Sequence, residues 1–502
     1  MKKVIYTLVL IFCIISTGFS QEKRVLTLDE VIELARQNSR SAKQAETSRT
    51  LGYWSYAVFR SQLKPQLLLR GTLPDFSNRP IQVRQDDGTF QFRNVNQNNS
   101  NLSLGLEQVL PWTNTTVSFD SRIARVDFFD TDITQYQGDP VGLTITQPLF
   151  AVNPFRWDRL IEPLQYEQSK RQFVQDMENT SRIAASLFFN LLVQQRNLQI
   201  EEQNEAANDT IFKVEQGRYN IGTTTEDQLL QTELDLITAQ NNAQQASLDV
   251  QSRTLDLRNF IGLTDDVELE LVPPTETPEF YIDVNLALRY AKENRAEFLD
   301  FQLRTLEQER NLAEARAARF NANLNASFGF SSDQFNNLGD VYDLGNNNSA
   351  SRVTLTFALP ILDGGRNRAR MNRARELQKL TDFNIEQDQI NFEQEIENAV
   401  RNFGQIRNQI EIAKKREEIA VKRFEITNGR YLAGKVDILQ LTDARTTKDA
   451  AIRNYISALQ QYWEAYYELR NLTLYDFENN ELLYNPLLEY DPKTDSVIEM
   501  NK

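Results

Sequence analysis

The chain has 502 residues, no histidine and one cysteine, Cys13, and its formal net charge at pH 7 is −15. The cysteine lies in a leader that is expected to be removed, so the mature chain has neither histidine nor cysteine. It therefore lacks the usual catalytic bases, thiol nucleophiles and soft metal ligands. The acidic balance also argues against nucleic acid as a partner, which would require a basic face.

Residues 1–20 are typical of a secretory signal peptide. Lys2 and Lys3 give a positive start, residues 4–15 form a short apolar core, and small residues precede a cleavage site expected near Ser20. That core is too short to be interpreted as a spanning helix, and no later segment reaches the roughly 18 apolar residues of one. An exported chain of this kind is either periplasmic or meets the membrane through strands, whose alternating pattern hides their hydrophobicity.

One sequence unit occurs twice. Residues 143–263 and 355–475 align without a gap at an offset of 212, and the motif Gly-Arg-Tyr-x-x-Gly occurs at 217–222 and again at 429–434. Such a long ungapped match indicates an internal duplication. Similar segments that begin at Leu28 and Val284 lie at an offset of 256, so an insertion of 44 residues falls in the first strand region.

The predicted segments follow one another in the same order in both repeats. After the signal peptide (1–20) we expect a first helix (21–65), strands with an enlarged loop (66–150), a long helical hairpin (151–263), a linker (264–281), a second helix (282–321), a second set of strands (322–362), a second long helical hairpin (363–475) and a C-terminal tail (476–502).

The two long helices are predicted by what interrupts them. From Pro154 to about Gln216, and from Arg366 to about Asn428, no break is expected, which gives helices roughly 90 Å long at 1.5 Å per residue. Apolar residues recur at steps of four and three over 392–431 and over 230–255. This period is typical of coiled coils. Their polar flanks suit the wall of a water-filled tube, although a structural rod explains the helices equally well.

The glycine motifs are predicted to reverse the chain. Gly217 and Gly429 are expected to end the helices, and Gly222 and Gly434 to allow the positive φ of the reversal. Thr225 then offers a cap for the returning helix.

The strand segments alternate apolar residues with small polar ones at 102–106, 117–119, 141–145, 324–330 and 353–359. A barrel wall with lipid outside and water inside needs this pattern, and an ordinary half-buried sheet shows it too. So few strands flanked by polar helices have no core to cover, which favours the barrel. In the insertion, Asp87-Gly88 is expected at a hairpin tip.

Together these features resemble the TolC-like outer membrane efflux proteins over about residues 26–475, leaving out the insertion and the tail. The resemblance implies an α+β membrane protein without a cofactor, located in the outer membrane and extending into the periplasm. It implies a homotrimer, with four strands per chain in a shared twelve-stranded β-barrel that continues as a periplasmic α-helical coiled-coil barrel. It also implies docking of a periplasmic adaptor (membrane fusion) protein and an inner-membrane pump. The four strands are expected to be kept, with 75–100 as an extracellular loop, although 101–125 could add a strand pair.

Particular residues are implicated by the same resemblance. The periplasmic gate is expected at Arg218, Tyr219, Arg430, Tyr431 and Asp443, and the adaptor-docking tip at Gly217, Gly222, Gly429 and Gly434. Val436 stands where the family has a gating arginine, and Gln440 where it has an aspartate ring. Arg430 or Lys435 could replace the arginine.

Two other function classes explain less. An enzyme would have to use acidic pairs such as Glu417-Glu418 or Asp265-Asp266, which belong to polar helix faces or a loop, so no enzyme is predicted. A periplasmic coiled-coil structural or adaptor protein without a pore would explain the helices but not the duplicated strands. We therefore expect an exit duct for small molecules, as in tripartite efflux, or for polypeptides, as in type I secretion.

Overall fold

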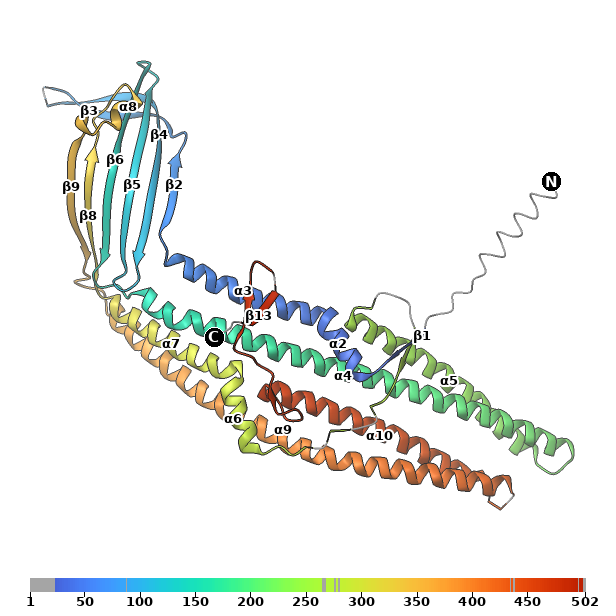
Figure 1. Cartoon of the computed structure of the whole chain (residues 1–502). Coiled ribbons are helices and arrows are strands. Elements are labelled where there is room, and N and C mark those ends of the chain that lie inside the picture. Colours follow the sequence, from blue (N-terminus) through green and yellow to red (C-terminus); the bar gives the residue numbers. More distant parts are fainter. Residues whose placement is uncertain are drawn as a thin grey trace, which may run out of the picture. The chain divides into compact units, whose positions relative to one another are not determined.

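The computed structural model describes residues 23–86, 88–263, 268–274, 277–278, 280–433, 435–436, 438–494 and 496–499. The expected signal peptide, Asp87, the Asp265-Asp266 pair and Gly434 lie outside the described residues. The chain divides into two compact units (Figure 1). The strand unit comprises Thr50–Ser169 and Ala296–Gln389, and the helical unit comprises Met1–Arg49, Lys170–Arg295 and Ile390–Lys502.

The strand unit contains an antiparallel sheet of seven strands (Figure 1). They are β2 (Gln66–Thr72), β3 (Phe76–Arg84), β4 (Phe90–Leu110), β5 (Thr115–Phe128), β6 (Ile133–Pro148), β8 (Asn321–Ser331) and β9 (Asn348–Ala358). Six of them lie side by side in the order β2-β4-β5-β6-β8-β9, and β3 pairs with the part of β4 beyond β2. The helices of this unit are parts of α3 (Arg40–Gln62), α4 (Pro154–Asn220) and α9 (Arg366–Leu432), together with α7 (Ala296–Ala317), α8 (Leu338–Val341) and the turn η1 (Leu344–Asn346).

The sheet corrects the expectation of four strands per chain. By the repeat offsets, β2 corresponds to β8 and β6 to β9, while β4 and β5 form an additional hairpin between β2 and β6. The segment 101–125 therefore adds a strand pair. Its alternating residues can satisfy their backbone groups in the ladder, which a loop cannot offer. Asn114, at φ +59, closes the β4–β5 turn by donating to the carbonyl of Leu110 at 2.8 Å.

The hairpin tip expected in the insertion is present. Ile81 pairs with Arg93, and Arg84 with Phe90. Gly88 has φ +84. Residues 76–84 and 90–98 are thus an extension of the sheet and not an irregular loop.

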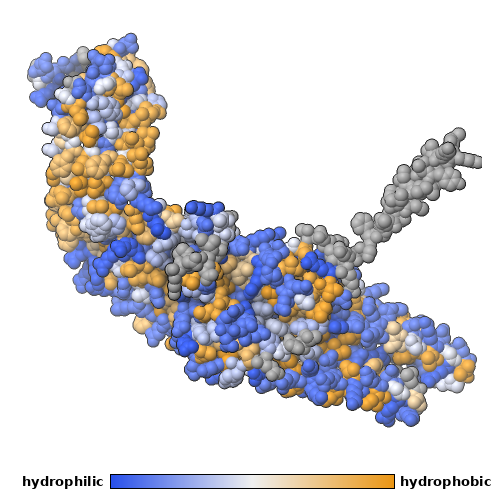
Figure 2. All heavy atoms as spheres, viewed as in Figure 1, coloured by the Kyte–Doolittle hydropathy of each residue, from blue (hydrophilic) through white to orange (hydrophobic). Residues whose placement is uncertain are grey.

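The register gives the sheet two different faces. One row across it pairs Leu67, Leu106, Phe119, Leu143 and Phe328 in turn. The adjacent row on the opposite face pairs the polar residues Gln66, Glu107, Ser118, Thr144 and Ser327 in turn. On the side seen in Figure 2, hydrophobic residues form a band across the sheet, and hydrophilic residues gather at its end near α8 and β3.

The helical unit contains most of two helical hairpins of equal dimensions. α4 (Pro154–Asn220) and α9 (Arg366–Leu432) have 67 residues each, and α5 (Glu226–Ile261) and α10 (Ile438–Thr473) have 36 each. Shorter elements are α2 (Leu28–Asn38), α6 (Val284–Asn294), and the parallel pair β1 (Lys23–Leu26) and β7 (Glu268–Leu271). The repeat in the sequence is thus a repeat of the structure.

The core of this unit lies where α4 packs on α10. Phe188 and Phe189 on α4 and Tyr462 on α10 are fully buried. Gln460 donates to the side chain of Asn190 at 3.2 Å across the same contact. On α9 the predicted seam is confirmed, since its members at 392, 396, 403, 406 and 410 are buried.

On α5 the predicted seam faces outward. The helix buries Ala239, Ala243 and Ala246, whose small side chains permit close approach of the neighbouring backbone. The apolar residues of the predicted seam are exposed instead: Leu230, Leu234, Ile237, Leu248 and Leu255. We call these five residues the α5 stripe.

The C-terminal tail packs on the helical unit through β10 (Tyr475–Asp476), β11 (Glu481–Leu482), β12 (Leu488–Asp491) and β13 (Ser496–Glu499). Lys170 pairs with Glu489 at 3.1 Å. Arg470 links Glu178 at 2.8 Å to Asp476 at 2.5 Å, and both carboxylates are nearly inaccessible to solvent. The tail is therefore joined to α4 and α10 by buried ion pairs.

Candidate functional site

The first helix tip is a Schellman motif that joins α4 to α5. The amide of Thr223 donates to the carbonyl of Arg218 at 2.9 Å, and the amide of Gly222 to that of Tyr219 at 2.9 Å. Gly222 has φ +73, the left-handed conformation that this motif requires. The Tyr-x-x-Gly spacing is therefore a backbone requirement, because glycine must stand three residues after the accepting carbonyl.

The helix after this tip begins at a capped residue. The hydroxyl of Thr225 accepts a hydrogen bond from the amide of Gln228 at 3.4 Å. Glu226 and Asp227 lie in the first turn of α5, where negative charge interacts favourably with the helix dipole.

The second tip repeats the first. The amide of Lys435 donates to the carbonyl of Arg430 at 2.9 Å, and these residues lie 212 positions after Thr223 and Arg218. Gly434, the counterpart of Gly222, lies outside the described residues.

The other two glycines do not end the helices as expected. α4 continues to Asn220 and α9 to Leu432, so Gly217 and Gly429 lie in the last turns. A methyl group at either position would meet open space. The helices end at Asn220 and Leu432, within the turns that the Schellman hydrogen bonds close. The first glycine of each motif does not adopt the positive φ of the reversal.

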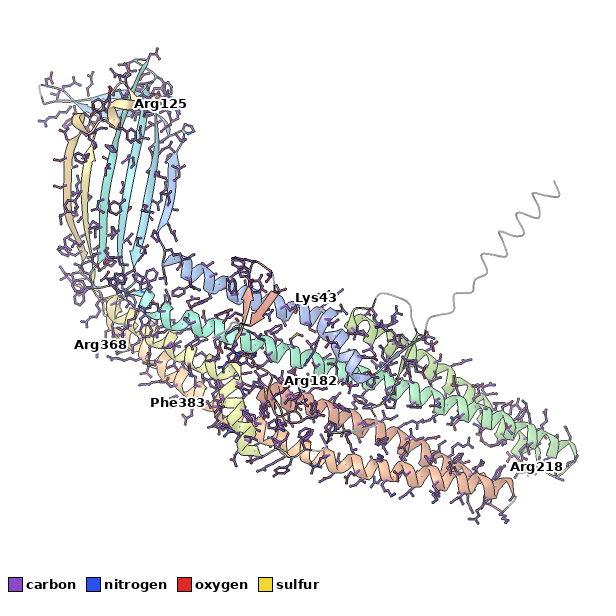
Figure 3. The ribbon with its side chains drawn as sticks, in the orientation of Figure 1. Lys43, Arg125, Arg182, Arg218, Arg368 and Phe383 are labelled. Carbon is purple, nitrogen blue, oxygen red and sulfur yellow. The ribbon has the colours of Figure 1, made fainter. Side chains whose placement is uncertain are left out.

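The side chains expected to form the gate at the first tip contact their own helix or solvent. Arg218, at the tip in Figure 3, pairs with Glu215 of the same helix at 2.6 Å. Tyr219 is 41% exposed. Neither side chain is buried, so both are accessible to another copy of the chain or to a partner.

At the second tip, Asp443 on α10 pairs with Arg423 on α9. Sequence reasoning identified Asp443 but missed Arg423. The signal was available, because in a helical hairpin that reverses around residue 433, residues 423 and 443 are equally far from the reversal.

A groove lies between α9 and α10 next to this ion pair. Its volume is about 790 Å³, and it is lined by Ile419, Lys422, Arg423, Ile426, Thr427, Arg430, Val436, Leu439, Gln440 and Asp443. We call it the tip groove. It brings together four residues singled out from the sequence, Arg430, Val436, Gln440 and Asp443, while Tyr431 does not line it. Three basic side chains against one acidic side chain make its lining basic, with apolar side chains between them.

The acidic pair Glu417-Glu418 does not form a site. Successive helix residues point in different directions, and Glu418 pairs with Lys415 at 2.9 Å, whose hydrogen bond lowers the pKa of Glu418. Burial raises the pKa of Glu417. No group of three or more acidic, histidine or cysteine side chains suited to a metal ion is found in the part of the chain that the structure describes.

Comparison with known proteins shows which family has this sequence and architecture. A family model described as outer membrane efflux protein matches residues 31–263 and 287–473, which carry the two repeats. The chain belongs to the outer membrane efflux protein family. It is thus an outer membrane efflux duct that extends into the periplasm, and its family is one of channels, not of enzymes. Every helix in the described ranges is either too short or too polar to be a membrane-spanning helix.

Solved structures share the fold at low sequence identity. The Campylobacter jejuni CmeC outer membrane channel has a TM-score of 0.64 and 16% identity, over 90% of this chain and 87% of that chain. A membrane protein from Pseudomonas aeruginosa has a TM-score of 0.62 and 17% identity, over 89% and 90%. The outer membrane protein VceC from Vibrio cholerae has a TM-score of 0.61 and 14% identity, over 89% and 95%. No curated protein matches the sequence.

Proposed function

We propose that three copies of this chain form one export duct, with a barrel made by the strand units and a periplasmic tunnel made by the helical units. The observation that carries the proposal is that, in a single chain, the sheet has two edge strands and the helical unit has an exposed apolar stripe. In the sheet, β2 and β9 stand at the two ends of the strand order. In the helical unit, the α5 stripe is apolar and exposed, and an apolar stripe on an exported helix requires a partner.

The gate of this duct is proposed at the helix tips. Arg218, Tyr219, Arg430 and Tyr431 of neighbouring tips hold each other in the closed state, and Arg423 with Asp443 fixes the second hairpin behind them. Charge-assisted hydrogen bonds contribute about 1.5–3 kcal/mol each. Contacts of this size allow a docked partner to shift the gate towards its open state.

The tip groove is the proposed docking site of a periplasmic adaptor, which an inner-membrane pump then drives. Lys422, Arg423 and Arg430 favour an acidic partner segment, and Ile426 and Leu439 favour one with apolar side chains. Gly217, Gly222, Gly429 and Gly434 are included in the proposed docking tips, where glycine adds no side chain. Small toxic molecules and secreted polypeptides are both candidates for the cargo.

Solubilisation and size determination test the duct. We expect the protein in the outer membrane fraction, as a detergent-extracted, heat-modifiable trimer. Leu234→Glu in the α5 stripe is expected to yield folded monomers, whereas the matched change Glu233→Gln leaves the trimer intact. A monomer released by osmotic shock would instead favour the coiled-coil rod.

A further inference from the structure

We infer that the additional β4–β5 hairpin is part of the membrane wall, so that the duct is closed by eighteen strands where the family resemblance implies twelve. The count is three copies of the six strands that lie side by side in each chain. The inference rests on the proposed trimer, and it concerns what this chain adds to the family plan.

The first argument is the continuity of the apolar face. Leu106 on β4 pairs with Leu67 on β2, and Phe119 on β5 pairs with Leu143 on β6. Leu106 and Phe119 are themselves paired, so the added strands fill the row between β2 and β6 without a polar gap. Phe119 is 53% exposed. In water, a hairpin that continued this apolar row would expose more apolar surface, which is unfavourable unless lipid or a partner covers it.

The second argument is the character of the opposite face. Glu107 on β4 and Ser118 on β5 pair with each other and continue the row to Thr144 on β6. Arg70 on β2 pairs with Glu107 at 2.6 Å on this face. The hairpin is therefore apolar on one side and polar or charged on the other, as in the wall of a water-filled membrane barrel.

The third argument is length. β4 has 21 residues and β5 has 14, whereas β8 and β9 have 11 each. About 9–11 residues suffice for a tilted strand to cross the membrane. The ladder between β4 and β5 runs from Gln97↔Phe128 to Leu110↔Thr115. Both strands are thus long enough to cross alongside β8 and β9.

Strand direction explains how identical copies close the sheet. Every neighbouring pair in the order β2-β4-β5-β6-β8-β9 is antiparallel. With an even number of strands, β2 and β9 run in opposite directions, so β9 of one copy can pair antiparallel with β2 of the next. An insertion of a single strand would have forced a parallel pair at each junction, whereas a hairpin preserves the alternation. The occupant of both edges is therefore a second copy of this chain.

The consequence is a wider duct. Barrel diameter grows roughly linearly with strand number, so eighteen strands give about one and a half times the diameter of twelve and about twice the cross-section. The inner face of the added hairpin carries the charged side chains of Glu107 on β4 and Asp120 on β5, and Glu107 pairs with Arg70 on β2. The duct is accordingly suited to hydrated, bulky cargo.

Paired cysteines test the strand order in the intact trimer. The one cysteine of the sequence, Cys13, lies in the leader that is expected to be removed, so only the introduced cysteines would react. With a short thiol–thiol cross-linker, Leu69→Cys/Leu104→Cys should join β2 to β4, and Phe119→Cys/Leu143→Cys should join β5 to β6. Leu67→Cys/Leu143→Cys, which share one row of the sheet with β4 and β5 between them, should react at least tenfold less. Efficient cross-linking of this last pair, with failure of the first two, would overturn the inference.

A lipid-exposure test uses different variants. Phe119→Arg should reduce trimer in the outer membrane at least tenfold, and the neighbouring change Ser118→Arg, on the inner face, should leave it nearly unchanged. Equal tolerance of both would place the hairpin outside the wall. Imaging of the wild-type trimer should count eighteen strands. Twelve strands would refute this inference alone, whereas absence of a trimer would refute the proposed function.

Discussion

Arg423 on α9 donates a charged hydrogen bond to the carboxylate of Asp443 on α10, next to the second helix tip. Both side chains are at least half exposed, and exposed ion pairs contribute only about 0.2–1 kcal/mol. The pair therefore positions the tip without locking it. This is the energy scale on which a docked partner can act.

Removal of this ion pair is expected to loosen the closed gate. In Arg423→Ala, Asp443 loses its partner and the ends of α9 and α10 separate more easily, so the closed-state conductance of single channels should rise. Lys415→Ala is the control, because it removes an exposed pair with Glu418 on the same helix. A rise of equal size in the control would show that the position of the pair is irrelevant.

Replacement of Arg430 and Tyr431 together is expected to give an intact but leaky trimer. Both residues lie in the last turn of α9, and Arg430 also lines the tip groove. Without their side chains, neighbouring tips lose the polar contacts that hold them together. Single-channel conductance is again the measurement. An unchanged low-conductance closed state would exclude these residues as the latch.

The glycines of the first motif should differ in their response to alanine. Gly222→Ala puts a Cβ on a residue at φ +73, which costs roughly 1–2 kcal/mol for an L-residue. Gly217→Ala meets open space inside a helix, where alanine is favoured over glycine. Amide hydrogen exchange at residues 219–224 should be about 5–30-fold faster in Gly222→Ala, and no faster in Gly217→Ala. Equal acceleration in both would contradict the Schellman assignment.

Two neighbouring positions on β9 test the lipid face. Phe357 is 63% exposed and belongs to the apolar face, while Thr356 alternates with it. Arginine at a lipid-facing position costs about 2–4 kcal/mol at mid-membrane and less towards an interface. Phe357 is the last but one residue of β9, so Phe357→Arg should reduce trimer assembly moderately and Thr356→Arg should be tolerated. If an assembly assay accepts both equally, β9 does not cross the membrane.

The sequence predicted the features that recur within it. The duplication, the two long helices and the positive φ of Gly222 all follow from the spacing of residues that occur in both repeats. The β4–β5 hairpin has no counterpart in the second repeat. The alternation at 102–106 and 117–119 indicated strands there, but without a repeated copy it did not decide between an extracellular loop and an added strand pair.

Which helix face packs against which neighbour could not be predicted from the periodicity of the sequence. The period of the α5 stripe correctly indicates a packed seam, but not that Ala239, Ala243 and Ala246 take the contact within the chain. The pairing of Arg423 with Asp443 requires one step beyond the period, namely the register of α9 against α10 about the reversal near residue 433.

The buried ion pairs at the C-terminal tail predict a pH dependence of stability. Asp476 is 2% exposed. Burial alone would raise its pKa, but Arg470 and the hydrogen bonds from Asn479 together hold that pKa below its ordinary value. Since the folded pKa is the lower one, the stabilisation is fully present above the ordinary aspartate value of about 3.9 and is lost as the pH falls through the folded value.

Asp476→Asn should therefore lower the thermal unfolding midpoint of the helical unit at pH 7, by the equivalent of about 1.5–3 kcal/mol for a lost charged hydrogen bond. The difference from the wild type should shrink as the pH falls below about 4, because the wild-type carboxyl is then also neutralised. Asp209→Asn is the matched control, since Asp209 pairs with Lys213 on an exposed helix face and such pairs contribute little. Unfolding curves over this pH range give the answer: a difference that is the same at pH 7 and pH 3 would show that the charge of Asp476 does not stabilise the tail.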